Sequence, residues 1–573
     1  MSKTTVYKGH VVSIVSRLCV VYALLLAVLG LVQGLGSNYS GPVHNTLASL
    51  DRYALVPEWG GSHIFPLLFA LFMLALAYEL WYRKKAALII LTFYMVVQGI
   101  LQLVSGISAH CAILNLLLAA VFLTSWKAFV AWPDPRYLRR LVGVVIIAVP
   151  ALMIYGTVGL YLGRREYGLS GESVALVKEA WLVVVGRSGI HFVGRDVLFK
   201  YTLAIAALAV AAYMLFLLLR SHGYTEGHDP EEESRARAIL AAHGGDSLSY
   251  FNTRTEKSYY FLRDECFLAY RVIAGMALIS ADPVGAEGTL AELLSRFKDH
   301  CLKMGWRLGG IAQSESTAKA LKNLGLRAFV LGEEAIVDLE GFTIEGRSVR
   351  KLRQSVNQMA RTGVYAEFMF NESMPSHLRY ELQKISTTWR GDSPETGYSM
   401  GLGRLLSSQD PDCLLALAYD SDARPIGFLY LVPMYPREGY SLDITRTKLG
   451  APRPLSDFLI SRTALFLKQE GYSYLSLHFL ALSQHYREDR EDDGSAFWRA
   501  VSKIIDRWFP VVSAYTFDKK FSPRCIKRYL VYPSYLEFLR TGFTVIAAES
   551  ALKLTRHTER AELEEAAQQL EMD

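Results

Sequence analysis

Cysteine is scarce in this 573-residue chain, and its cysteines are scattered. There are six of them, and no two form a CxxC pair. This spacing argues against both a zinc site and a framework of disulfides. We therefore expect reduced, buried thiols, and we expect no metal and no cofactor. The six are Cys19, Cys111, Cys266, Cys301, Cys413 and Cys525.

Acidic residues are absent from one stretch of the second half, between Glu345 and Glu367. The net charge of the whole chain, +6 from 61 Lys+Arg and 55 Asp+Glu, decides little. The local absence matters more, because five cations lie there at helical spacings of three and four residues and so share a broad face. They are Arg347, Arg350, Lys351, Arg353 and Arg361. This basic stripe predicts a polyanion ligand; a plain solvated helix face is the alternative.

Apolar residues are concentrated at the other end of the chain. Roughly the first 220 residues contain about six apolar spans, each long enough to cross a hydrocarbon core of about 30 Å. The first span is too long and uninterrupted for a cleaved signal peptide. The predicted spans are Val11–Gly34, Ile64–Tyr82, Ala86–Val104, Cys111–Val130, Leu141–Leu162 and Val197–Leu219.

Lys and Arg are distributed unevenly over the turns between these spans. They lie before the first span, after the second and after the fourth, and are nearly missing after the first and third. The positive-inside rule then places both ends of the chain in the cytoplasm. The long loop Gly163–Asp196 would lie outside, and its apolar run near Trp181 suggests an interfacial or re-entrant helix. Polar residues within the spans, such as Gln102 and Asn115, would line a headgroup path or hydrogen-bond between helices.

The remainder of the chain alternates between short β-like runs and amphipathic helices, which predicts α/β layers. The expected strands are Phe267–Val272, Ala277–Ser280, Ala335–Asp338, Leu414–Tyr419, Ile426–Pro433 and Tyr474–Leu477. The expected helices are Leu290–Met304, Thr317–Leu324, Val349–Arg361, Ser376–Trp389, Leu455–Glu470 and Ser495–Phe509. The pattern occurs twice. We therefore predict a membrane domain at 1–222, a linker at 223–240, subdomains at 241–368 and 369–545, and a charged helical tail at 546–573.

Eight short runs in this half, taken in order, resemble the aminoacyl-phosphatidylglycerol synthase family, to which the lysyl-phosphatidylglycerol synthases of multiple peptide resistance belong. They are Ala242–Phe251, Phe267–Val272, Ser280–Gly285, Leu331–Ala335, Arg347–Asn357, Gly397–Arg404, Ser441–Arg446 and Phe517–Tyr529. The resemblance is closest to the actinobacterial branch, in which a lysyl-tRNA synthetase can be fused. No synthetase sequence follows here, so the donor is expected to be the charged tRNA of the cell.

The resemblance implies a helical membrane bundle of about six spans followed by a cytosolic tandem GNAT-like (acyl-CoA N-acyltransferase-like) α/β domain. It also implies transfer of an aminoacyl group, most commonly lysyl, from aminoacyl-tRNA to a glycerol hydroxyl of phosphatidylglycerol in the inner leaflet of a bacterial plasma membrane. The cationic product would lower the surface negative charge and protect against cationic antimicrobial peptides. The basic stripe would then bind tRNA phosphates, with anionic headgroups as the competing ligand.

The resemblance directs attention to Asp443 and Arg446 in the run SLDITR. The activated ester needs a positioned hydroxyl, a proton acceptor and a stabilised oxyanion. Asp443 could deprotonate the lipid hydroxyl or bind the α-amino group, and Arg446 could hold the lipid phosphate. A structural ion pair is the alternative. The family usually has Leu-Met where Ile444 and Thr445 stand, which bears on packing more than on chemistry.

Further candidates come from the other runs. Lys520, in the motif before the last aromatic, could neutralise the oxyanion, with Lys519 beside it binding substrate. Glu334 is a candidate catalytic carboxylate and Glu333 a candidate substrate ligand; because they are adjacent, only one would face the cleft if they lie in a strand. Asp282, followed by proline, would bind substrate or shape a turn.

Other functions remain open from the sequence. An acyl-CoA-dependent acyltransferase on the same fold would need a pyrophosphate loop of the type [RQ]xxGx[GA], and Tyr398 stands where Arg or Gln is needed. A peptidoglycan-type aminoacyl transferase shares the tandem fold. A non-catalytic protein for lipid transport or membrane scaffolding is a third alternative. The sequence leaves open which amino acid is transferred, which lipid accepts it, whether the spans flip lipid, and whether the chain forms a homo-oligomer.

Overall fold

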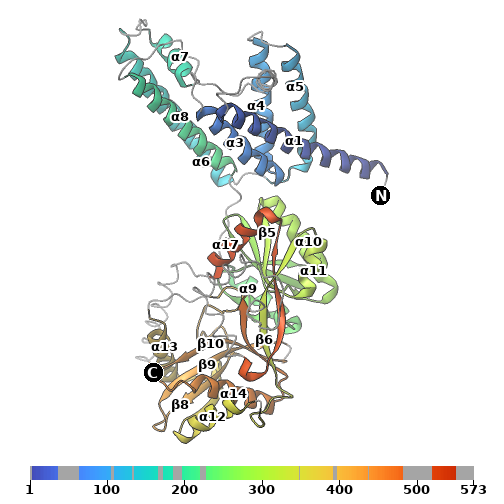
Figure 1. Cartoon of the computed structure of the whole chain (residues 1–573), viewed down its shortest axis with the longest axis vertical. Coiled ribbons are helices and arrows are strands. Elements are labelled where there is room, and N and C mark those ends of the chain that lie inside the picture. The colour runs from blue at the N-terminus through green and yellow to red at the C-terminus, as the bar shows by residue number, and fades with distance from the viewer. Residues whose placement is uncertain are drawn as a thin grey trace. The chain divides into compact units, whose positions relative to one another are not determined.

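The computed structural model describes most of the chain, and its two units are treated one at a time. The described residues are 3–35, 64–104, 109–131, 135–165, 172–184, 196–219, 227–347, 349–391, 397–435, 438–481 and 519–549. The chain divides between Gly223 and Tyr224 into a helical N-terminal unit and an α/β C-terminal unit (Figure 1).

Seven α-helices make up the described part of the N-terminal unit. They are α1 (Lys3–Leu35), α3 (Ile64–Trp81), α4 (Lys85–Val104), α5 (Ala109–Thr124), α6 (Pro135–Leu162), α7 (Ser173–Val184) and α8 (Asp196–Leu219). Every predicted span falls on one of these helices, and α7 confirms a helix within the loop predicted to lie outside.

Three of these helices are long and apolar enough to cross a membrane by length and composition. The stretches are Ile14–Val32, Ala109–Ala128 and Arg139–Leu162. The apolar stretches of α3, α4 and α8 are shorter: Phe69–Trp81, Lys85–Ile100 and Tyr201–Met214. The helices are thus confirmed, while the bundle of six spans stays a prediction.

Polar side chains inside this unit hydrogen-bond between helices. Asn115 of α5 donates to Gln102 of α4 over 3.0 Å, and Tyr22 of α1 donates to Asn115 over 3.2 Å. A buried amide in an apolar bundle needs such partners, because no water is at hand to satisfy it. This pair therefore serves interhelical packing, one of the two roles expected from the sequence.

One twelve-stranded sheet runs through the C-terminal unit. Its order is β1-β2-β3-β5-β12-β6-β11-β10-β9-β8-β7, with β4 paired to β2. The strands are β1 (Ser258–Leu262), β2 (Cys266–Ile273), β3 (Met276–Ser280), β4 (Val284–Gly285), β5 (Arg307–Gln313), β6 (Arg327–Asp338), β7 (Tyr365–Phe370), β8 (Leu414–Tyr419), β9 (Pro425–Met434), β10 (Gly439–Thr447), β11 (Tyr474–Ala481) and β12 (Arg524–Tyr532). Strand β12, from the far end of the chain, lies between β5 and β6.

Helices cover both faces of this sheet. They are α9 (Pro230–His243), α10 (Glu287–Met304), α11 (Glu315–Asn323), α12 (Arg350–Arg361), α13 (Ser376–Arg390), α14 (Leu455–Gln469) and α17 (Phe538–Glu549). Alternate residues of β8 and β9 belong to two different cores. Leu415 and Phe428 join a core with α13, and Ala416 and Leu429 join a core with α12 and α14. We call these sides the α13 face and the α14 face.

The predicted elements are confirmed wherever the structure describes them. All six predicted strands and five of the six predicted helices are present; the sixth, Ser495–Phe509, lies outside the described residues, as does the tail beyond Glu549. Residues 230–243, largely inside the predicted linker 223–240, form α9. Asp229 caps this helix and Pro230 opens it, and Ala236, Ile239 and Leu240 pack into the core of the α13 face.

Candidate functional site

Strands β10 and β11 form a fork in the middle of the sheet. They pair in parallel only from Gly439 to Ser441 on β10 and from Tyr474 to Ser476 on β11. Beyond these residues, among the described strands, β10 pairs only with β9, and β11 only with β6. Each strand carries a register shift at the point of separation, next to Asp443 on β10 and to Leu477 on β11. Such irregularities redirect side chains, and they are common beside active sites.

The shift in β10 places Asp443 and Arg446 on the same face. In a regular strand, residues three apart point to opposite faces. Here Tyr440 and Leu442 pack in the core of the α14 face, whereas Ile444 packs in the core of the α13 face, so the alternation is broken between Leu442 and Ile444. The aspartate and the arginine can therefore serve one site on the α13 face.

The contacts of the two side chains agree with this assignment. Asp443 accepts a hydrogen bond from the backbone N–H of Leu402 over 3.1 Å. Arg446 donates to the Ser386 hydroxyl over 3.3 Å, and its guanidinium lies 4.3 Å from the centre of the Trp389 ring. Leu402 and helix α13, which carries Ser386 and Trp389, both pack on the α13 face. The loop thus provides a partner for Asp443 and helix α13 provides partners for Arg446. The catalytic roles of the two residues stay predictions.

A buried arginine fixes the loop Gly397–Arg404, which lies against Asp443. The Arg254 guanidinium donates to the carbonyls of Gly397, over 2.5 Å, and Gly401, over 3.2 Å, and pairs with Glu256. Burial alone would lower the pKa of Arg254, but Glu256 raises it above its ordinary value, with a smaller contribution from Asp443. Arg254 therefore stays charged. It fixes the loop by hydrogen bonds and interacts electrostatically with the Asp443 carboxylate.

Helix α17 holds the first residues of the same loop. Glu549 accepts hydrogen bonds from the backbone N–H groups of Tyr398, over 2.6 Å, and Ser399, over 3.2 Å. The Ser399 hydroxyl also donates to it, over 2.6 Å. Tyr398 is fully buried and donates to the Leu278 carbonyl over 2.9 Å. The loop is thus anchored from two sides of the core.

Behind the fork, Glu334 forms a buried ion pair with Arg528 of β12. The Arg528 guanidinium reaches Glu334 over 2.6 and 2.8 Å and Asp246 over 2.6 Å. Burial alone would lower the pKa of Arg528, but the carboxylates of Asp246 and Glu334 raise it. Glu334 also accepts a hydrogen bond from the Ser476 hydroxyl over 2.5 Å. Ser476 is the last residue of β11 that pairs with β10, so the ion pair is connected to the fork.

This ionic cluster continues to β10 and to Asp282. Arg528 donates to the Ser247 hydroxyl over 2.9 Å, and Ser441 donates to the Ser247 carbonyl over 2.6 Å. Asp282 accepts from the backbone N–H of Ser314, which caps α11, over 2.8 Å. Burial and the neighbouring Asp246 carboxylate raise the pKa of Asp282. Asp282 thus shapes a turn, and its role in substrate binding stays a prediction.

The two adjacent glutamates lie in strand β6, with 5% and 0% of their surface exposed. Glu333 and Glu334 therefore do not lie in a solvent-facing turn, since the apolar run that they precede extends back over them as a buried central strand. Ala335 and Val337 belong to the core of the α14 face, so Glu334 lies on the α13 face and Glu333 on the other. Their roles as catalytic and substrate-binding residues stay predictions.

Lys520 lies at the edge of the α14 face. Its ammonium group is 3.0 Å from both carboxylate oxygens of Asp457 on α14, and one third of its side chain is exposed. Asp457 also accepts from Ser355 on α12 over 2.9 Å. Lys520 therefore joins the basic helix to α14 in this structure, and a role at the oxyanion stays a prediction. Lys519 begins the short 3-10 turn Lys519–Phe521.

Helix α12 carries most of the basic stripe. Leu352, Val356 and Met359 pack beneath it in the core of the α14 face. Arg350, Lys351 and Arg361 are exposed on the helix, and Arg347 is exposed just before it. Arg353 is half-buried and donates to the Gly346 carbonyl over 3.0 Å. Among the described residues, no carboxylate pairs with any of the five, so their charges are available to an external anion.

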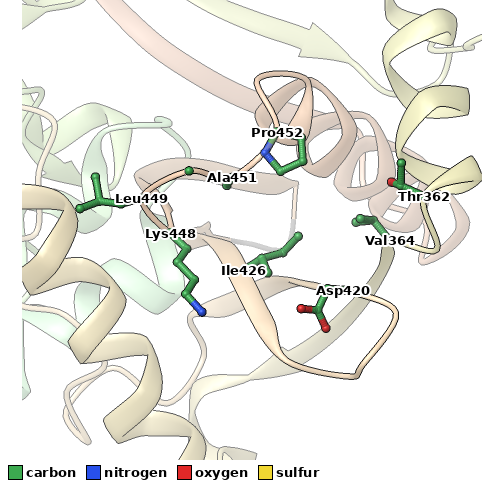
Figure 2. Close-up of a pocket in the computed structure, with 9 residues that line it drawn as sticks. Thr362, Val364, Asp420, Ile426, Lys448, Leu449, Ala451 and Pro452 are labelled. Atoms are coloured by element: carbon green, nitrogen blue, oxygen red, sulfur yellow. The ribbon is translucent and has the colours of Figure 1, made fainter.

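A separate hollow of about 280 Å³ opens beside the C-terminal end of α12 (Figure 2). It is lined by Thr362, Val364, Asp420, Ile426, Lys448, Leu449, Gly450, Ala451 and Pro452. One acid and one base face a mostly apolar wall, and no predicted site residue lies in it. Over the described parts of the chain there is also no group of three or more His, Cys, Asp or Glu that could hold a metal ion.

Several residues of the site were not singled out from the sequence. Asp246 and Arg528 lie in two of the eight runs, and their opposite charges in buried, distant segments could have suggested a pair. Arg254 and Lys257 lie outside the runs and gave no signal. Lys257 is fully buried and donates to the Phe251 carbonyl over 2.7 Å and the Ser280 hydroxyl over 2.8 Å. Burial, reinforced by Arg254, lowers its pKa well below the ordinary value.

Comparison with known proteins places these features in a family. The chain is 30% identical over 506 residues, 85% of its length, to the lysylphosphatidylglycerol biosynthesis bifunctional protein LysX of Rhodococcus opacus. It is equally similar over 507 residues to the protein of that name from Rhodococcus jostii. It spans 45% of the length of each of these relatives.

The structure of L-PGS from Bacillus licheniformis shares the fold of the C-terminal unit, with a TM-score of 0.50 at 23% identity. The match covers 56% of this chain and 98% of that one. This match agrees with the GNAT-like fold expected for the C-terminal unit, and the tandem arrangement stays a prediction.

A family model, phosphatidylglycerol lysyltransferase, C-terminal, matches residues 237–532. That range is just over half of the 573 residues and contains the fork, the ionic cluster and the basic helix. The chain therefore belongs to the phosphatidylglycerol lysyltransferase family.

Proposed function

We propose that the protein transfers an aminoacyl group, lysyl in the first instance, from aminoacyl-tRNA to the glycerol hydroxyl of phosphatidylglycerol. The observation that carries the proposal is the shared face of Asp443 and Arg446 beside the fork of β10 and β11. In a chain of this family, a carboxylate and a guanidinium facing one site suit a reaction between a lipid hydroxyl and an activated ester. The names of the relatives favour lysine, and the exchange itself would serve other amino acids.

The chemistry requires one proton transfer and one exchange of ester bonds. Asp443 accepts the proton of the glycerol hydroxyl while that oxygen attacks the carbonyl carbon of the aminoacyl ester. A new C–O bond forms to the lipid, the bond to the ribose oxygen of the tRNA breaks, and the proton passes to that oxygen. No ATP is consumed, because the ester is already activated. Arg446 holds the lipid phosphate, so the hydroxyl lies close to the carboxylate.

The two substrates call for different surfaces. The exposed cations of α12 form the anion-binding surface for tRNA phosphates. The lipid comes from the bilayer that the apolar helices of the N-terminal unit would occupy. The α/β unit then lies on the cytoplasmic side of a bacterial plasma membrane, where aminoacyl-tRNA is found. The cationic product would lower the negative surface charge and weaken the binding of cationic antimicrobial peptides.

The test is a cell-free assay with the full chain in lipid nanodiscs containing phosphatidylglycerol, supplied with radiolabelled lysyl-tRNA. We expect a labelled, ninhydrin-positive lipid whose formation stops when RNase is added first. Asp443→Asn should lower kcat by roughly 10²- to 10⁴-fold, the usual contribution of a positioned general base. Asp422→Asn, an exposed aspartate in the β8–β9 turn, is the matched control and should leave kcat unchanged.

Two results would refute the proposal. Product formation that is insensitive to RNase and dependent on an acyl-CoA would assign the protein to the acyl-CoA-dependent transferases. An unchanged lipid composition both with the native chain and with Asp443→Asn would leave a non-catalytic membrane protein.

A further inference from the structure

Helix α17 and the turn before it expose large apolar side chains on one side. Leu536, Leu539, Phe543 and Ile546 have exposed fractions of 91%, 68%, 72% and 51%. Their spacing of three, four and three residues puts them in one stripe on a helix. Tyr535, 69% exposed, begins the stripe. We call these five residues the α17 stripe.

The fully buried residues of the same helix are small or polar, whereas Phe538 and Val545 are only partly buried. Thr541, Thr544 and Ala548 are the residues of α17 that are buried, and Ala548 packs in the core of the α13 face. A helix on the surface of a water-soluble domain normally buries its large apolar residues and exposes its polar ones. Helix α17 instead exposes Leu539, Phe543 and Ile546, which indicates that its outer side meets an apolar environment.

The charges around the stripe favour an anionic partner. Both carboxylates of the segment are turned inward: Glu537 is 1% exposed and pairs with Arg307 over 3.2 Å, and Glu549 binds the loop at Tyr398 and Ser399. The arginines near the stripe are more exposed to solvent than Glu537. Arg540 lies 3.8 Å from the Glu537 carboxylate and keeps 32% of its side chain exposed. The exposed Arg327 lies with its guanidinium 3.8 Å from the centre of the Tyr535 ring.

We propose that the α17 stripe docks the α/β unit onto an anionic lipid bilayer. Apolar side chains that enter the acyl region, a tyrosine at the interface and arginines at the headgroups are the features of an interfacial helix. A bilayer is the expected partner because three helices of the same chain are long and apolar enough to cross one. The inference rests on the proposed function only in that a lipid substrate is to be delivered there.

Docking at this helix is linked to the site through hydrogen bonds to one loop. Glu549, at the end of α17, holds the backbone of Tyr398 and Ser399, and the N–H of Leu402 in the same loop binds Asp443. A helix fixed on the membrane thereby fixes the loop that orients the proposed base. The stripe is thus a positioning surface, and its loss should affect the use of bilayer lipid rather than the chemical step.

The first experiment reads membrane contact without any need for catalysis. The full chain carries Cys525→Ser, since Cys525 is the one described thiol that is not buried. A bimane probe is attached at Phe543→Cys or Leu539→Cys, and the protein is reconstituted in nanodiscs of phosphatidylglycerol and phosphatidylethanolamine. We expect at least twofold quenching by lipids that carry a doxyl group near the headgroup, and less in discs of phosphatidylcholine alone. A probe at Leu449→Cys, whose native side chain is 69% exposed, should not be quenched.

Either failure of quenching overturns the proposal. A probe at position 543 that iodide quenches from water faces solvent. A probe that neither iodide nor doxyl lipid reaches is covered by protein, such as another segment of this chain or a second copy of it. Because this readout needs no turnover, it can succeed even if the proposed transfer reaction is refuted.

The second experiment separates docking from chemistry. The variant Leu539→Ser/Phe543→Ser should raise the KM for phosphatidylglycerol in nanodiscs by about tenfold and leave transfer to water-soluble dihexanoyl phosphatidylglycerol unchanged. Leu449→Ser removes a side chain of equal exposure elsewhere on the unit and should change neither. An unchanged KM in nanodiscs, or an equal loss with both lipids, would contradict a docking role.

Discussion

Gly403 shows how closely the site depends on single residues. Its φ is +74°, and a Cβ added there would lie 2.7 Å from the Arg254 guanidinium carbon. Any side chain at this position would therefore be strained and would also displace the arginine that holds the loop. Leu402, whose N–H binds Asp443, is the residue before it. The orientation of the proposed base thus depends on the absence of a side chain one residue away.

We predict that Gly403→Ala lowers kcat for lipid aminoacylation at least tenfold and leaves the KM for aminoacyl-tRNA unchanged. The physical reason is that the loop must move to relieve the contact with Arg254, and Asp443 loses its fixed partner. Gly450→Ala is the matched control, because Gly450 has φ +83° and open space around its Cβ position. Gly450→Ala should lose about 1–2 kcal/mol of stability in thermal unfolding, the usual cost of a left-handed alanine, and Gly403→Ala should lose at least as much. Equal kcat values in the two variants would contradict this role for the loop.

The sequence supplied candidate site residues but not their arrangement in space. The run SLDITR pointed to Asp443 and Arg446, but regular strand alternation would have put them on opposite faces. The register shift that brings them together depends on how β9, β10 and β11 pair, which no local pattern encodes. Glu334 is the reverse case. Its place in a conspicuous acidic pair suggested a free carboxylate, whereas Arg528, distant in sequence, neutralises it.

At the scale of elements, strong periodicity made helices easier to predict than strands. Helix α12 was predicted within a residue of its start, because apolar residues at positions 352, 356 and 359 alternate with cations. Six of the described strands were not predicted: β1, β4, β5, β7, β10 and β12. Two of them, β5 and β12, lie inside the sheet. The first contains two adjacent glycines, and the second carries basic residues such as Arg524 and Lys527 typical of a solvated loop. Both lie inside the sheet because their neighbours supply the burial, which is a tertiary effect.

The basic helix gives the prediction that belongs to this scale. We expect Arg350→Gln/Lys351→Gln to raise the KM for aminoacyl-tRNA about tenfold without lowering kcat at saturation. The slope of log affinity against log salt concentration should fall by about 0.7–0.9 for each tRNA phosphate that is no longer neutralised, and so by at most about 2. Filter binding of charged tRNA at about 50–300 mM salt, where screening of exposed charges is still incomplete, checks this.

Lys319→Gln/Lys322→Gln, two exposed cations on α11, is the matched control and should change neither quantity. A stripe variant that keeps its tRNA affinity but no longer binds vesicles containing phosphatidylglycerol would assign the stripe to the membrane headgroups instead.

At the scale of the whole molecule, one continuous sheet joins the two predicted subdomains of the C-terminal unit. Strand β12 belongs to the later half of the sequence and pairs with β5 and β6 of the earlier half. Strand β7 crosses the predicted boundary between residues 368 and 369. The ionic cluster lies at this junction, since Arg528 comes from β12, Glu334 from β6, and Asp246 from the segment after α9. Separating the two predicted subdomains would therefore expose a buried arginine and its carboxylates.

The last prediction concerns membrane topology, on which the supply of donor depends. Positive charge before the first predicted span, and after the second and fourth, predicts a cytoplasmic α/β unit. In a Cys525→Ser background, the reporter cysteines Arg83→Cys and Leu449→Cys should react with a membrane-impermeant maleimide only after cells are permeabilised. Ser40→Cys, in the turn predicted to lie outside, should react in intact cells. The reporters at positions 83 and 449 share a side if the predicted spans between them cross the membrane an even number of times. Labelling of position 449 from outside would separate the α/β unit from all aminoacyl-tRNA, and the proposed reaction would then have no donor.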